Sequence, residues 1–140
     1  MKPDQNLFST QRSSWVSEVT FDAIKHFAWG IGDNNPLWVD SNYGISSFLG
    51  ETIAPPSFAY AIDETTIAPG NNEYERHYET VDWQWFHHLE IGDIVKSEQQ
   101  LTQEVIDPSN GILRQVGETS FFSESKGLVA KARVTTRRDR

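Results

Sequence analysis

Few side chains in this 140-residue sequence can carry acid–base or nucleophilic chemistry near neutral pH. There are four histidines and no cysteine, which excludes thiolate nucleophiles, disulfides and cysteine-ligated metals. His87 and His88 are adjacent, and neighbours on a strand point to opposite faces, so this spacing matches no known set of metal ligands. His26 lies on the surface of a predicted helix, and His77 lies in an acidic run. No histidine pattern alone therefore marks a catalytic site, and no metal site is expected.

A polar segment, Asp33-Asn34-Asn35-Pro36, directly follows the first predicted helix. It opens a stretch, residues 33–57, that is dominated by turn-forming residues. Long irregular segments inside compact domains are often functional. For Asp33 itself, the local pattern also fits a residue at a helix C-terminus or in an Asx-turn, with no chemical role. The segment is thus a candidate functional region in which the role of Asp33 stays open.

Two helices and a shorter helical segment are expected to position these residues. Residues 21–29 repeat apolar side chains at intervals of three to four, and Thr20 suits the N-cap of that helix. A short helix is expected near 41–48. Pro56 fits the first turn of a second, buried helix of about ten residues, because its missing N–H costs nothing there.

The second half of the sequence favours antiparallel strands. Long runs rich in β-branched and aromatic residues lie at 74–86, 92–106, 112–124 and 128–138, and a short strand is expected at 15–19. Residues 107–111 form a strong hairpin signal, and residues 125–127 a weaker one. This order predicts one α+β domain over residues 1–140. In that fold a buried central helix is wrapped by a curved antiparallel sheet of about five to six strands.

The charge distribution limits the classes of partner. The net charge is −8, with −13 over residues 1–125 and +5 over residues 126–140. An acidic body disfavours nucleic acid. The basic end, with Arg133, Arg137, Arg138 and Arg140, is expected to be a solvated strand end, and contact with a phosphate or an acidic partner is the alternative. No apolar run approaches the length of a membrane helix, and the N-terminus lacks an apolar signal core. We therefore expect a cytoplasmic protein that binds neither nucleic acid nor membrane.

Three segments of the sequence carry a family resemblance. Residues 27–40 (FAWGIGDNNPLWVD) resemble the first motif of the MaoC-like hydratase/dehydratase family, and residues 50–58 (GETIAPPSF) resemble its second. The Ala-Pro-Pro-x-Phe spelling is similar to the FAS1-like N-terminal dehydratase branch. Residues 83–93 (WQWFHHLEIGD) resemble a third family segment. The resemblance implies a hot-dog fold that pairs as a dimer or double hot dog, with an acyl tunnel near the pair interface.

The same resemblance implies a reaction and its machinery. Family members add water to a 2-enoyl thioester or remove it, using a carboxylate, a histidine and a backbone N–H that polarises the thioester carbonyl. In this chain the carboxylate corresponds to Asp33, the histidine position is Trp38, and the glycine that donates its N–H is Pro56. An indole N–H is a donor only, and proline has no N–H. One of the three parts is therefore retained.

The resemblance predicts a subunit that shapes the acyl tunnel while a partner hot-dog subunit supplies the Asp/His dyad. One alternative is a self-sufficient hydro-lyase that uses Asp33 on an unusual acyl or polyketide-like substrate, and another is a non-catalytic acyl-binding module. The substrate is a thioester of coenzyme A or a carrier protein, without a further cofactor, and the chain forms a homodimer or a heteromer. The implied substrate-binding residues are Asn35, Pro36, Trp38, Ala54, Pro55, Pro56, Ser57 and Trp85. For Trp83 and Trp85, which alternate on one strand face, packing in the core or at a dimer interface competes with a ligand wall.

Overall fold

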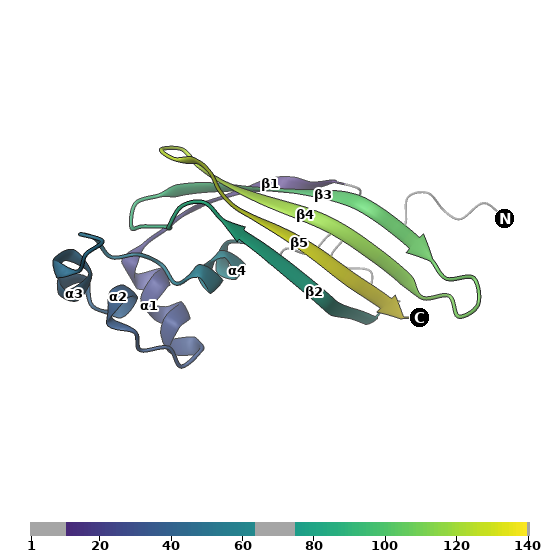
Figure 1. Ribbon diagram of the computed structural model, residues 1–140, viewed down its shortest axis with the longest axis horizontal. Coiled ribbons are helices and arrows are strands. Elements are labelled where there is room, and N and C mark those ends of the chain that lie inside the picture. The colour runs from purple at the N-terminus through teal and green to yellow at the C-terminus, as the bar shows by residue number, and fades with distance from the viewer. Residues whose placement is uncertain (1–10, 64–74, 140) are drawn as a thin grey trace.

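The computed structural model describes residues 11–63 and 75–139, and within them a curved antiparallel sheet dominates the chain (Figure 1). The sheet has five strands in the order β1-β3-β4-β5-β2. The helices gather beneath one end of it, and the C-terminus lies toward the other end (Figure 1). The strands are β1 (Gln11–Glu18), β2 (Glu75–Trp85), β3 (Ile94–Ile106), β4 (Leu113–Ser123) and β5 (Gly127–Asp139). The expected curved sheet is confirmed; the bounds of β2 to β5 agree closely with the sequence pattern, whereas β1 begins four residues before the expected strand at 15–19.

The helices that precede the sheet follow local capping rules. Helix α1 (Phe21–Gly30) begins as expected, because the Thr20 Oγ1 accepts the N–H of Ala23 at 3.2 Å. Helix α3 (Ser41–Ser46) lies within the predicted region 41–48. Between them lies helix α2 (Pro36–Val39), which the sequence analysis missed. Its signal is the Asn35-Pro36 pair, an N-cap residue followed by proline at the first helical position.

The second predicted helix forms but is shorter than expected. It consists of a 3₁₀ turn, η1 (Pro56–Phe58), continued by α4 (Ala59–Ile62). The chain leaves the helix at Asp63, whose φ of −150° and ψ of 127° are extended. The Asp63 carboxylate accepts hydrogen bonds from side chains of β3, so contacts with the sheet end the helix. The rest of the expected helix, residues 64–65, lies outside the described residues.

The core forms where these helical turns meet the inner face of the sheet. Its buried members include Ile24 of α1, Phe58 and Ile62 of the second helix, and Phe121 and Val129 of the sheet. Their burial removes apolar surface from water, which is the main favourable contribution to folding. The short helix pair therefore takes the place of the buried central helix in the expected hot-dog arrangement.

Both predicted hairpins are confirmed, but one expectation about β5 is wrong. The first hairpin turn is closed by the Asp107 N–H on the Ile112 carbonyl at 2.9 Å, and β4 passes into β5 through residues 124–126. The basic end of the chain is not simply solvated. Arg138 is only 2% exposed, and its Nε donates to Gln115 Oε1 at 3.0 Å. The strand alternation places Arg138 on the same inner face as Val134.

Candidate functional site

The loop before η1 is held against the connection between β2 and β3. The Ala54 N–H donates to the Leu89 carbonyl at 2.7 Å, and Ile53 forms an isolated antiparallel bridge with Glu90. Ala54 is buried. These backbone contacts bring the residues of the second motif directly beside those of the third, and they fix where η1 begins.

A pocket of about 320 Å³ opens at this junction. Ala54 and Pro56 line it from the loop, and Trp85 lines it from the end of β2. His87 and His88, both exposed, also line it. The sequence analysis placed neither histidine near the residues of the other two motifs. No local sequence signal predicts this approach, because it depends on contacts between distant segments, such as the hydrogen bonds from the N–H groups of Phe86 and His87 to the Val129 carbonyl.

The loop that carries the two histidines is anchored by a charged cluster that sequence reasoning also missed. The Lys126 Nζ donates to the His88 carbonyl and to Asp93 Oδ2, each at 2.9 Å, and it forms an ion pair with Glu90. Asp93, buried at 7% exposure, also accepts the Glu90 N–H at 2.9 Å. Burial alone would lower the pKa of Lys126, but its hydrogen bonds to Glu90 and Asp93 outweigh burial and raise the pKa above its usual value. The ammonium therefore stays charged and holds one wall of the pocket.

Asp33 takes part in local backbone turns. The N–H of Gly32 donates to the Trp29 carbonyl and that of Asp33 to the Ala28 carbonyl, with Gly32 at a φ of 72°. This is a Schellman termination of α1, which favours glycine at that position. Asp33 Oδ1 then accepts the Asn35 N–H at 3.0 Å. Asp33 thus forms the predicted Asx-turn, and it is not among the described residues that line the pocket.

The other residues of the first motif shape the chain. The Asn35 Oδ1 accepts the Leu37 N–H at 3.1 Å and caps α2, with Pro36 in its first position. Trp38 is partly buried and packs against the core cluster. Its indole Nε1 is buried and has no hydrogen-bond partner among the described residues. Trp38 is therefore a packing residue here, consistent with an indole that cannot shuttle protons.

The two tryptophans of β2 form an aromatic wall beside the second helix. Trp83 stacks on Trp85 with ring centroids 5.7 Å apart, and on Phe121 at the same distance. The Trp83 Nε1 donates to the Tyr60 hydroxyl at 3.1 Å. Both tryptophans pack against the core while remaining partly exposed. Trp85 thus belongs both to the core edge and to the pocket. Of the remaining predicted residues, Pro55 is buried and Ser57 is exposed.

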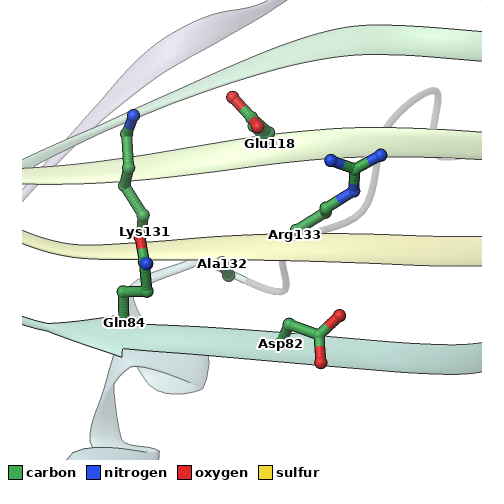
Figure 2. Close-up of a pocket in the computed structure, with 6 residues that line it drawn as sticks. All are labelled: Asp82, Gln84, Glu118, Lys131, Ala132 and Arg133. Atoms are coloured by element: carbon green, nitrogen blue, oxygen red, sulfur yellow. The ribbon is translucent and has the colours of Figure 1, made fainter.

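A second pocket, of about 280 Å³, lies on the opposite face of the sheet (Figure 2). Arg133 of β5 stands in register with Asp82 on β2 and Glu118 on β4. With Lys131 also present, two basic and two acidic side chains balance one another. Opposite charges on neighbouring strands stabilise a sheet, so this pocket offers no net charge for an ionic ligand. No group of three or more His, Asp or Glu residues within 11–63 and 75–139 could hold a metal ion.

Comparisons with known proteins agree with the observed fold. A curved antiparallel sheet around short helical turns defines a hot-dog domain. The family model for the FAS1-like dehydratase domain region matches residues 8–132, and the chain belongs to this family of MaoC-like hot-dog dehydratases. A search of curated protein sequences found no match. Among the helices that the structure describes, none is long and apolar enough to cross a membrane.

Solved structures with the same fold share little sequence with this chain. The R-hydratase PhaJ1 of Pseudomonas aeruginosa is 20% identical, with a TM-score of 0.71, covering 91% of this chain and 80% of that one. The MaoC-like dehydratase of Rhodospirillum rubrum is 17% identical, with a TM-score of 0.72 and 91% of each chain covered. The ChsH1-ChsH2 complex of Mycobacterium tuberculosis is 13% identical, with a TM-score of 0.74, covering 92% and 84%. At these identities the likeness establishes the fold.

Proposed function

We propose that this chain is a subunit of an acyl-thioester hydratase or dehydratase of the 2-enoyl-CoA type. It shapes the acyl tunnel, while a partner hot-dog subunit supplies the Asp/His dyad. The substrate is a thioester of coenzyme A or of a carrier protein, and no further cofactor takes part. One observation carries the proposal. Pro56 lies at the start of η1 and lines the pocket, at the position where the family motif has an N–H donor.

The chemistry explains why this position matters. Hydration needs one proton taken from water and one delivered to the α carbon, and the oxygen that gains charge needs a fixed donor. Proline cannot supply that donor. Trp38, at the position of the family histidine, packs against the core cluster. The scaffold is thus kept while two catalytic parts are replaced, which supports a role beside a second subunit. The ChsH1-ChsH2 structure shares this fold and is a complex of two proteins. This likeness also supports a partner subunit for the present chain.

The direct test compares the chain alone with the chain in complex. Purified alone, it should not hydrate crotonyl-CoA. Co-expressed with a MaoC-type subunit that has an intact Asp/His motif, it should form a stable heteromer of defined native mass that is active. The partner expressed alone is the control, and it should be less active than the complex on longer acyl chains. Robust hydration by the isolated chain would overturn the proposal.

The second candidate is a self-sufficient hydro-lyase, favoured by the two imidazoles that line the Pro56 pocket. In that case Asp33 is the general base, and His87 or His88 is the general acid that delivers the proton. His87→Gln and His88→Gln would separate the two candidates in a homo-oligomer. If one of them abolishes turnover while the other leaves it intact, the self-sufficient enzyme is supported. If the isolated chain binds thioester but forms no product, an acyl-binding module remains.

A further inference from the structure

A tyrosine hydroxyl near the Pro56 pocket has a hydrogen to donate. Tyr60 lies in α4, and its hydroxyl oxygen accepts the Trp83 Nε1–H at 3.1 Å. This bond uses a lone pair of the oxygen and leaves the O–H itself available as a donor. The hydroxyl makes no other hydrogen bond to the residues that the structure describes. The proposed function assigns no role to this group.

The Tyr60 ring is held against the aromatic wall. Its centroid lies 5.2 Å from that of Trp83, with an angle of 81° between the two planes, and Trp83 in turn stacks on Trp85 at 5.7 Å. An edge-to-face ring contact and a hydrogen bond thus join the same two side chains. Because both the ring and the hydroxyl oxygen are held, the O–H has a defined position, as a preorganised donor requires.

The helical turns and β2 place this pair one step from the pocket. Tyr60 follows Pro56 by four residues, which corresponds to a rise of roughly 6–8 Å along the helical turns. Trp83 precedes Trp85 by two residues, or about 7 Å along the strand. The two spacings match, so the Tyr60–Trp83 contact lies beside the place where Pro56 and Trp85 line the pocket. A helical side chain also leans toward the N-terminus of its helix, which brings the Tyr60 ring toward Pro56.

This position is accessible from outside the core. Tyr60 is 37% exposed, and Trp83 and Trp85 are both partly exposed. β2 is the last strand of the described sheet, and α4 lies beside its end (Figure 1). The hydroxyl therefore lies at the rim of the sheet, and a ligand in the Pro56 pocket reaches it along the exposed side of the aromatic wall.

We propose that Tyr60 is a binding residue for the acyl thioester and donates its O–H to the thioester carbonyl oxygen. The donor that Pro56 cannot supply thus comes from the next turn of the same helical segment. A hydroxyl that accepts an indole N–H is polarised toward donating its own hydrogen. This inference rests on the proposed function and adds the group that recognises the carbonyl, while the partner subunit still supplies the dyad.

Two ligands that differ only at the carbonyl test this role without requiring turnover. Hexanoyl-CoA carries the carbonyl, and S-hexyl-CoA has a methylene group in its place. Titration calorimetry on the full chain gives the ratio of the two affinities. Tyr60→Phe keeps the ring and loses the hydroxyl. It should reduce the ratio of hexanoyl-CoA to S-hexyl-CoA affinity about three- to tenfold from the wild-type value, as expected for one hydrogen bond.

Tyr43→Phe is the matched control. Tyr43 of α3 is 50% exposed and loses the same hydroxyl, but it is not among the described residues that line the Pro56 pocket. Its affinity ratio should stay at the wild-type value, and because each ratio is taken within one protein, a general loss of stability does not change it. An unchanged ratio in Tyr60→Phe, or an equal change in Tyr43→Phe, would overturn the role of Tyr60 alone. Failure of the wild-type chain to bind either ligand would overturn the proposed function, and this inference with it.

Discussion

Replacing Lys126 by methionine should expose how strongly the charged cluster holds the wall of the pocket. The change removes three contacts of the Lys126 Nζ, to Asp93, to Glu90 and to the His88 carbonyl. The Asp93 side chain, 6% exposed, loses its cationic partner. Breaking a fully buried pair costs about 3–5 kcal/mol. Because the Lys126 side chain is 20% exposed, we expect a smaller cost of about 2–3 kcal/mol in the free energy of unfolding.

Thermal and urea unfolding measure this cost. With an unfolding entropy of about 2.1 cal/mol/K per residue, the Tm should fall by roughly 7–10 °C. The matched control is Lys96→Met, because the Lys96–Glu98 pair is 3.0 Å long but 49% and 46% exposed. That variant should lose less than about 1 kcal/mol. Adding Asp93→Asn to Lys126→Met should cost less than the two single changes together by about 1 kcal/mol or more. Additive costs would refute the buried-pair argument.

The pKa of Lys126 gives the same prediction a pH dependence. Its pKa is raised in the folded protein by Glu90 and Asp93, against the opposing effect of burial. A group whose folded pKa is raised contributes its stability fully below its unfolded pKa, near 10.5, and loses it as the pH rises through the folded value. The wild-type protein should therefore lose stability above about pH 10.5. Lys126→Met should lack this part of the alkaline decline.

Three further changes test the site and the fold. The double variant Trp38→His/Pro56→Gly returns an imidazole and a backbone N–H, and the isolated chain should gain measurable crotonyl-CoA hydration, since one such donor is worth about 10²–10³ in kcat. Asp33→Asn should leave steady-state turnover of the heteromer within about threefold, because the partner's dyad performs the proton transfer; a loss beyond about hundredfold would support the self-sufficient enzyme instead. Gly44→Ala would place a Cβ 2.8 Å from the Thr52 Cα, and urea unfolding should reveal a loss of about 1–3 kcal/mol.

Local chemistry explains which parts of the fold were predictable. The Thr20 cap and the turn at residues 107–111 depend on neighbours a few positions apart. Both are visible in the sequence and agree with the structure. Even the missed helix α2 had a local signal in Asn35-Pro36. The Asx-turn of Asp33 could also be predicted from the sequence, because it joins residues only two positions apart.

Long-range pairing decided the rest. His87 and His88 line the Pro56 pocket because the end of β2 turns over the loop, an arrangement that depends on β5 and on Leu89. The early end of α4 at Asp63 depends on side chains of β3 more than thirty positions away. The amino-acid sequence alone thus determined the strands, helix α1 and the hairpin turns in their order, since propensity and turn chemistry are local. Only the register of the assembled sheet decided which polar groups meet inside it, because that register is set by the packing of all five strands at once.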